Sequence, residues 1–133
     1  MKLFENESVI VSIDESIPCL EWIGKGPLSS QTFRESETKS LALYQEYKPK
    51  YPVLEWFVDA RKIRSLLPDD VEWVAQKILP QFAAAGLTKE VFVLPESAIG
   101  RFVVTNYTDM ATGKTIEIKA FVSAQDAKNW LKA

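Results

Sequence analysis

The chain has 133 residues, of which 47% are hydrophobic and 26% are charged, a composition typical of one globular domain spanning residues 1–133. Its 18 acidic and 16 basic side chains give a formal charge of -2, which argues against a general nucleic-acid binder. It contains no histidine and one cysteine, Cys19. This excludes an intrachain disulfide, imidazole-based metal sites and Ser-His or Cys-His catalytic pairs, so we expect no metal and no cofactor.

The first residues lack the apolar core of an export signal, and no stretch reaches the ~18 apolar residues that span a bilayer. The sequence also offers no disulfide, which would indicate an oxidising compartment. We therefore expect a cytoplasmic protein that is not integral to a membrane.

Alternating side chains predict a strand over 8–14, and a second strand over 17–23 closes an antiparallel hairpin with it. A helix is predicted over 28–48, with Ser29 as its N-cap. The apolar stripe of this helix leaves four charged residues that we expect to face water, namely Glu35, Glu37, Lys39 and Glu46.

Residues 53–59 are nearly all apolar, which is typical of a strand covered on both faces, and 90–94 follow the same pattern. Between them, a helix is predicted over 68–85. Pro80 should bend this helix or separate its last turn, and Gly86 should end it.

Beyond the second buried strand we expect a helix over 97–110, a strand over 115–122 and a short last helix that begins at Ser123. Alternating strands and helices predict an α/β fold. We expect a mixed, mostly parallel sheet of about five strands, with the N-terminal hairpin at one edge and about four helices.

Three segments suggest a family. They are the strand ending Trp56-Phe57-Val58-Asp59, the helix containing Val71-Glu72-Trp73, and residues 120–123 followed by 126–131. With the order of elements, they resemble the SpoIIAA-like (STAS-like) proteins over nearly the whole chain. The resemblance implies a mixed sheet with helices packed beside it, in a protein that binds other proteins or small apolar ligands rather than catalysing a reaction.

The same resemblance bears on regulation by phosphorylation. In the anti-sigma-factor antagonists of that family, a serine or threonine in an Asp-Ser-Ser/Thr-Gly turn after the central strand is phosphorylated. The matching turn here is Asp59-Ala60-Arg61-Lys62, which keeps the aspartate but lacks both the hydroxyl acceptor and the glycine. We therefore expect a member without the phosphorylation switch.

Three cations lie within four residues directly after the predicted central strand. Arg61, Lys62 and Arg64 follow Asp59 at the carboxyl end of that strand, where open α/β sheets bind ligands. They are suited to a phosphate, a carboxylate or an acidic protein surface. The alternative is a solvated loop whose arginines pair with Asp59, Asp69 or Asp70.

Two tryptophans lie opposite the apolar stripes assigned to their elements. Trp22 is in the second predicted strand and Trp73 in the helix 68–85. Exposed tryptophans are typical of interfaces, so both are candidates for a homodimer or partner surface. The alternative is ordinary burial in a core that covers both faces of the sheet.

These features favour a non-catalytic protein-binding or regulatory module that self-associates or binds a protein partner. One alternative is a carrier or sensor of a small apolar or anionic ligand, held between the sheet and the helix 28–48 or 97–110. A more remote alternative is a histidine-independent enzyme, which would need Asp59, Glu96 and Arg61 to converge in a cleft with strongly shifted acidities.

Overall fold

The computed structural model describes residues 1–64, 66–97, 100–101, 104–105, 107–108 and 116–133. The predicted hairpin is confirmed: β2 (Val9–Asp14) pairs antiparallel with β3 (Cys19–Gly24). The strand predicted from residue 17 begins two residues later, because residues 15–18 form the connecting turn. Side chains alternate across β2, so Val9, Val11 and Ile13 all enter the same core.

A strand that the sequence analysis did not predict precedes this hairpin. Residues Lys2–Glu5 form β1, which pairs antiparallel with β2 and makes the sheet six-stranded rather than about five-stranded. With two apolar residues between charged ends, β1 shows too little alternation to be recognised. The pairing register shifts between Lys2 and Phe4, an irregularity that is common at sheet edges.

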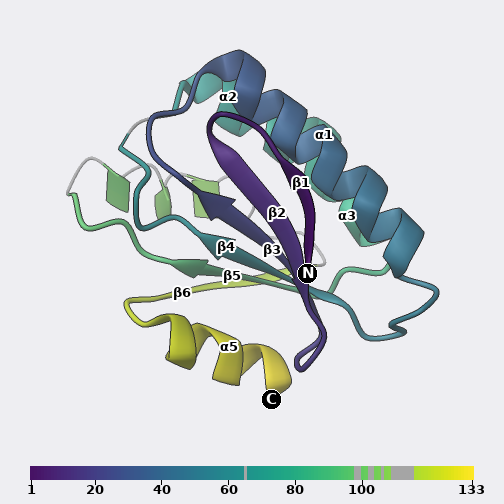
Figure 1. Ribbon diagram of the computed structural model, residues 1–133. Coiled ribbons are helices and arrows are strands. Elements are labelled where there is room, and N and C mark those ends of the chain that lie inside the picture. Colours follow the sequence, from purple (N-terminus) through teal and green to yellow (C-terminus); the bar gives the residue numbers. More distant parts are fainter. Residues whose placement is uncertain (65, 98–99, 102–103, 106, 109–115) are drawn as a thin grey trace.

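The other strands are β4 (Glu55–Asp59), β5 (Lys89–Val93) and β6 (Glu117–Phe121). The sheet has the order β1-β2-β3-β4-β5-β6, and β3 to β6 run parallel to one another (Figure 1). The prediction of an α/β fold with a mixed, mostly parallel sheet and an N-terminal hairpin is therefore confirmed.

The connection from β3 to β4 contains α1 (Ser30–Tyr47). Ser29 is its N-cap, as predicted: the Ser29 hydroxyl accepts the backbone N–H of Thr32, and the Thr32 hydroxyl accepts the backbone N–H of Ser29. This reciprocal capping box satisfies two N–H groups that would otherwise lack partners at the start of the helix.

The helix predicted over 68–85 consists of three consecutive segments, α2 (Pro68–Trp73), the π-helical η1 (Val74–Ile78) and α3 (Leu79–Ala84). Pro80 lies in the first turn of α3, so the prediction that it separates the last part of the helix is confirmed. Proline has no N–H to continue the α-helical bonding, and the wider π turn absorbs the interruption. Gly86, with a φ of 108°, follows the helix in a conformation that side-chain-bearing residues rarely adopt.

The helix predicted over 97–110 lies partly outside the described residues. Those that are described, at 100, 101, 104, 105, 107 and 108, are helical. The final helix is α5 (Ala124–Lys132), and the Ser123 hydroxyl caps it by accepting the backbone N–H of Asp126.

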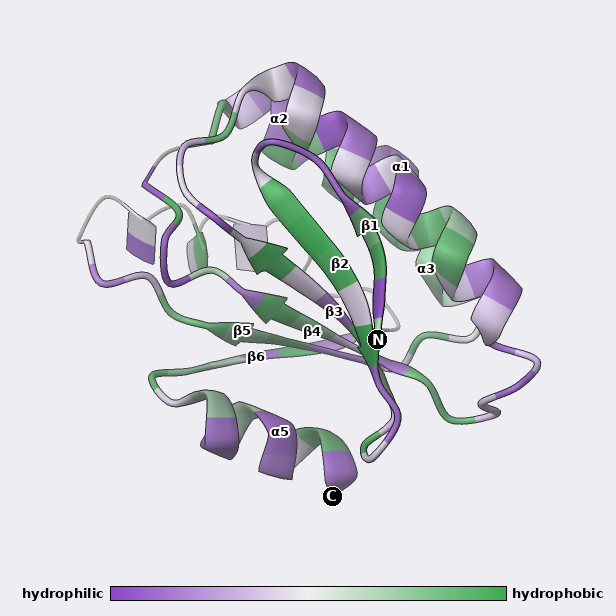
Figure 2. Ribbon diagram, viewed as in Figure 1, coloured by the Kyte–Doolittle hydropathy of each residue, from purple (hydrophilic) through white to green (hydrophobic). Residues whose placement is uncertain are grey.

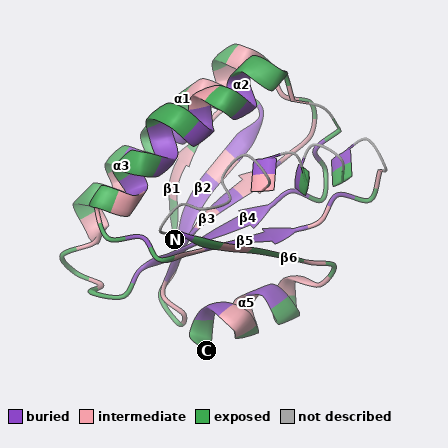
Figure 3. Cartoon of the chain, turned by 180° about the vertical axis from the view of Figure 1, so that it is seen from behind, coloured by how far each residue is buried: buried purple, intermediate pink, exposed green. Residues whose placement is uncertain are grey.

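The two faces of the sheet are covered unequally. One face carries the large core, in which Trp22 and Trp56 pack among residues of α1 and of the α2–α3 segment (Figures 1 and 2). The other face is covered by α5, whose Ala127 and Leu131 pack on a smaller cluster that includes Phe57. Figure 3 shows the central strands largely buried and β6 largely exposed.

Among the described residues, no helix combines the length and the apolar character needed to cross a membrane.

Candidate functional site

The carboxyl ends of β3, β4 and β5 meet at one edge of the sheet, because these strands are parallel neighbours. The register places Asp59 beside Ile23 on one side and beside Val93 on the other. The segments that leave these three strands line an open cleft of about 1150 Å³. Its charged lining residues are Lys25, Asp59, Arg61, Lys62, Arg64 and Glu96.

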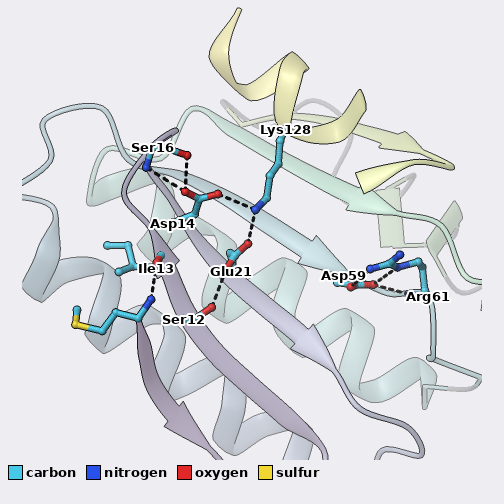
Figure 4. Close-up of polar contacts among 9 residues, drawn as sticks. Ser12, Ile13, Asp14, Ser16, Glu21, Asp59, Arg61 and Lys128 are labelled. Carbon is cyan, nitrogen blue, oxygen red and sulfur yellow. Dashed lines mark hydrogen bonds and ion pairs between the residues drawn. The ribbon is translucent and has the colours of Figure 1, made fainter. Parts of the chain in front are cut away.

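Asp59 and Arg61 form a bidentate ion pair in this cleft (Figure 4). Arg61 Nε donates to Asp59 Oδ1 at 3.0 Å and Nη2 donates to Oδ2 at 2.7 Å, while the Arg61 backbone N–H donates to Oδ1 at 3.2 Å. The hydrogen bond to Asp59 raises the pKa of Arg61 above its usual value. The pairing fixes the direction of the guanidinium and leaves its other N–H groups available to a ligand.

Lys62 and Arg64 are exposed, and neither side chain has a hydrogen-bond or ion-pair partner within the described part of the chain. One partner considered for the arginines, Asp70, binds Arg34 instead, with 2.7 Å between Arg34 Nε and Asp70 Oδ1. The explanation by internal pairing therefore holds for Arg61 alone. Lys62 and Arg64 are free to meet an external anion.

Four cations and two carboxylates line the cleft, in a chain whose net charge is negative. Lys25 forms an ion pair with Glu5 at 2.7 Å, which reduces its contribution to the positive charge of the cleft. Asp59, Glu96 and Arg61 do converge here, as the enzyme alternative requires, but Arg61 engages both carboxylate oxygens of Asp59. That pairing occupies the atoms that an acid or base would need.

A second polar cluster lies under α5 (Figure 4). Lys128 Nζ is 2.7 Å from both Asp14 Oδ2 and Glu21 Oε2, and Ser12 donates to Glu21 Oε1 at 2.8 Å. Hydrogen bonds to Lys128 and Ser16 lower the pKa of Asp14 to about 2.

The potential ligand atoms of Asp14, Cys19 and Glu21 lie within 4.8 Å of one another, a spacing that suits a metal ion. The Lys128 ammonium already bridges the two carboxylates, however, and burial raises the pKa of the Cys19 thiol well above its usual range. We therefore interpret the cluster as the contact that fixes α5 to the sheet.

The two candidate interface tryptophans differ in position. Trp22 is 1% exposed and its indole N–H donates to Ser36 Oγ at 2.9 Å. It is therefore a buried core residue, which was the alternative to an interface role. Trp73, at the end of α2, is half-buried against the same core, with the Arg34 guanidinium 4.8 Å from its ring centre. A role of Trp73 in an interface stays a prediction.

Three glutamates, Glu37, Glu55 and Glu90, are buried, and the sequence analysis does not predict the burial of any of them. Glu37 is 5% exposed, so the prediction that it faces water is wrong, and Glu90 is 1% exposed. Both line a cavity of about 40 Å³ between the sheet and α1. Glu37 lies four residues after Phe33 and four before Leu41, a spacing that could have placed it on the buried stripe.

Comparison with protein-family models, curated proteins and solved structures finds no match to this chain.

Proposed function

We propose that this chain is a non-catalytic binding module that holds a carboxylate or phosphate group of a partner in the cleft at the carboxyl ends of β3, β4 and β5. One observation carries the proposal: Lys62 and Arg64 are exposed and have no partner in the described residues, beside an Arg61 whose guanidinium Asp59 holds in place. A preoriented guanidinium with two unpaired cations next to it in the chain suits a planar or tetrahedral anion.

The resemblance to SpoIIAA-like proteins supports a binding role for this edge of the sheet. The turn that carries the phosphorylated hydroxyl in that family corresponds here to Asp59-Ala60-Arg61-Lys62. In this chain the turn carries permanent positive charge. The absence of histidine further supports binding rather than catalysis.

The acidic group could come from a protein segment or from a free ion, so the experiment uses one probe for each. A fluorescein-labelled oligoglutamate peptide reports binding by fluorescence anisotropy, and inorganic phosphate is titrated as a competitor. We expect the peptide to bind the native chain. Full displacement by phosphate at millimolar concentration would identify a free anion as the preferred ligand.

The double variant Lys62→Gln/Arg64→Gln should bind the peptide at least about tenfold more weakly, since each charge-assisted hydrogen bond contributes about 1.5–3 kcal/mol. The matched control is Lys77→Gln/Lys132→Gln, which removes two positive charges at exposed positions outside the cleft. Equal affinity of the two double variants would contradict the proposal, as would no binding of either probe.

A further inference from the structure

The cavity between the sheet and α1 is lined by both aromatic and acidic side chains. Four aromatic side chains, Trp22, Phe33, Phe92 and Tyr107, contribute to it, and two carboxyl groups, Glu37 and Glu90, face it. Trp22 lies edge-on to Phe33, with 6.3 Å between ring centres, and Phe92 lies edge-on to Tyr107, at 5.2 Å. This site shares Ile63 with the basic cleft but is otherwise lined by different residues.

Of the two carboxyl groups, Glu90 has a hydrogen-bond partner and Glu37 has none in the described part of the chain. Tyr107 donates its hydroxyl to Glu90, at 3.0 Å from Oε1 and 3.2 Å from Oε2. Glu37 has no hydrogen-bond partner among the described residues, and its Oε2 is fully buried. No lysine or arginine is among the residues that line the cavity in the described part of the chain.

A buried polar atom without a partner costs about 1–3 kcal/mol, and a buried unpaired carboxylate costs more. A cavity of about 40 Å³ has room for about three water-sized groups, since one water needs roughly 10–15 Å³ on this measure. Water alone would hydrogen-bond to the carboxyl groups but would gain little from the aromatic walls. A small cation with an apolar part would use both, because aromatic faces attract positive charge.

We propose that this cavity is a binding site for a small alkylammonium ion, whose N–H groups donate to Glu37 and Glu90 and whose alkyl group packs against Trp22, Phe33 and Phe92. The ligand class is opposite in charge to that of the basic cleft, so this inference goes beyond the proposed function and does not depend on it. The cavity volume limits the ligand to about three non-hydrogen atoms.

The protonation of the two glutamates makes the proposed binding depend on pH. Burial raises the pKa of Glu90 to about 8 despite the hydrogen bond from Tyr107, and burial together with Glu90 raises the pKa of Glu37 well above its usual value. The titratable groups that face the cavity are Glu37 from α1, Glu90 from β5 and Tyr107, whose pKa burial also raises. An arriving cation must therefore displace a proton, and its affinity should increase with pH up to about 8.

The test uses methylammonium as the probe, with methanol as a neutral molecule of the same size and formate as an anionic one. Nuclear magnetic resonance of the Trp22 indole N–H provides a local readout, because this group lies at the cavity wall and donates to Ser36. We expect a saturable shift with methylammonium alone. Its affinity should rise up to about tenfold per pH unit between about pH 6 and 8, as expected when one proton is released.

Glu37→Gln keeps the shape of the side chain and should weaken methylammonium binding at least tenfold, and Glu90→Gln provides a second variant in case the first does not fold. The matched control is Glu46→Gln, an exposed position on the same helix. The Lys62→Gln/Arg64→Gln variant should bind methylammonium like the native chain, which separates this test from that of the cleft. No saturable shift at about pH 8, or an equal shift with methanol, would overturn the proposal.

Discussion

At the scale of single residues, Lys128 provides the charged contact between α5 and the sheet. Its ammonium bridges Asp14 and Glu21 at 2.7 Å and lies 5.0 Å from the centre of the Phe57 ring. Burial opposes the charge on Lys128, but the hydrogen bonds to the two carboxylates outweigh it and raise its pKa. Without this ammonium, two partly buried carboxylates would face each other with no positive charge between them.

Lys128→Met should therefore lower the free energy of unfolding by about 1–3 kcal/mol at neutral pH, measured by urea denaturation. The effect should depend on pH in a defined direction. Because the pKa of Asp14 falls from 3.8 to about 2 on folding, its stabilisation is present above the unfolded pKa and is lost as pH falls toward 2. The variant should lose less stability over that interval than the native chain.

Lys132→Met serves as the control for that substitution, since Lys132 is exposed on the same helix. Its stability should stay within about 0.5 kcal/mol of the native value. Identical acid-induced losses in the native chain and Lys128→Met would show that the Lys128 contact is not formed.

For Glu90, we expect folding stability to depend on pH in the opposite direction. Its folded pKa of about 8 lies above the usual glutamate value of 4.5, so between these pH values the folded chain binds a proton that the unfolded chain has released. The stabilisation is complete below the unfolded pKa and is lost as pH rises toward 8, with a slope of up to about 1.4 kcal/mol per pH unit.

Glu90→Gln should flatten this part of the stability curve, measured by urea denaturation at several pH values between about 5 and 8. Glu46→Gln, at an exposed position, should leave the slope unchanged. If Glu90→Gln also leaves it unchanged, Glu90 is not protonated in the folded chain.

These residues show where sequence reasoning reaches its limit. Arg61, Lys62 and Arg64 were correctly placed at the carboxyl end of a central strand, because the end of an apolar run can be recognised in the sequence. Glu37 was assigned to the solvent because charged residues are usually exposed. Its burial depends on the sheet and on Tyr107, which are remote in sequence and bring the cavity together only in the folded chain.

At the scale of elements, the start of α1 is determined by a capping box, which is a local sequence feature. The Ser29 hydroxyl accepts the Thr32 N–H at 3.1 Å, and both residues take part in the capping box. Such signals lie within four residues of each other, which is why the start of this helix could be predicted. By contrast, β1 depends on pairing with β2 rather than on its own pattern, and it could not be predicted.

Ser29→Ala should lower the free energy of unfolding by about 1 kcal/mol, the usual cost of losing an N-cap. Thermal or urea unfolding measures the change. The control is Thr38→Ala, at an exposed position within the same helix, which should be neutral or slightly stabilising because alanine favours the helix. An equal loss in both variants would mean that the capping bond contributes nothing measurable.

At the scale of the whole molecule, charge is distributed unevenly. The chain is negative overall, yet two unpaired cations, Lys62 and Arg64, lie in a cleft, and two of its buried carboxyl groups, Glu37 and Glu90, line a neighbouring cavity. Exposed charges are screened by salt and buried ones much less. The two proposed sites should therefore respond differently to ionic strength.

Raising the salt concentration from about 0.1 M to about 1 M shortens the screening length from about 10 Å to about 3 Å. We expect the affinity for the oligoglutamate peptide to fall by about tenfold or more, and the affinity for methylammonium to change much less. Fluorescence anisotropy and nuclear magnetic resonance titrations at both concentrations measure the difference. A peptide affinity that does not change with salt would argue against ion pairing at the cleft.

Among the described strands, each one after β1 lies next to the strand that precedes it along the chain. Each newly synthesised strand thus finds its partner already in place, and no earlier pair must separate to admit a later one. Figure 1 shows the strands following one another across the sheet from β1 to β6, so strands that are added in chain order would all join at the same edge. This architecture suits assembly on the ribosome, where folding can follow translation step by step.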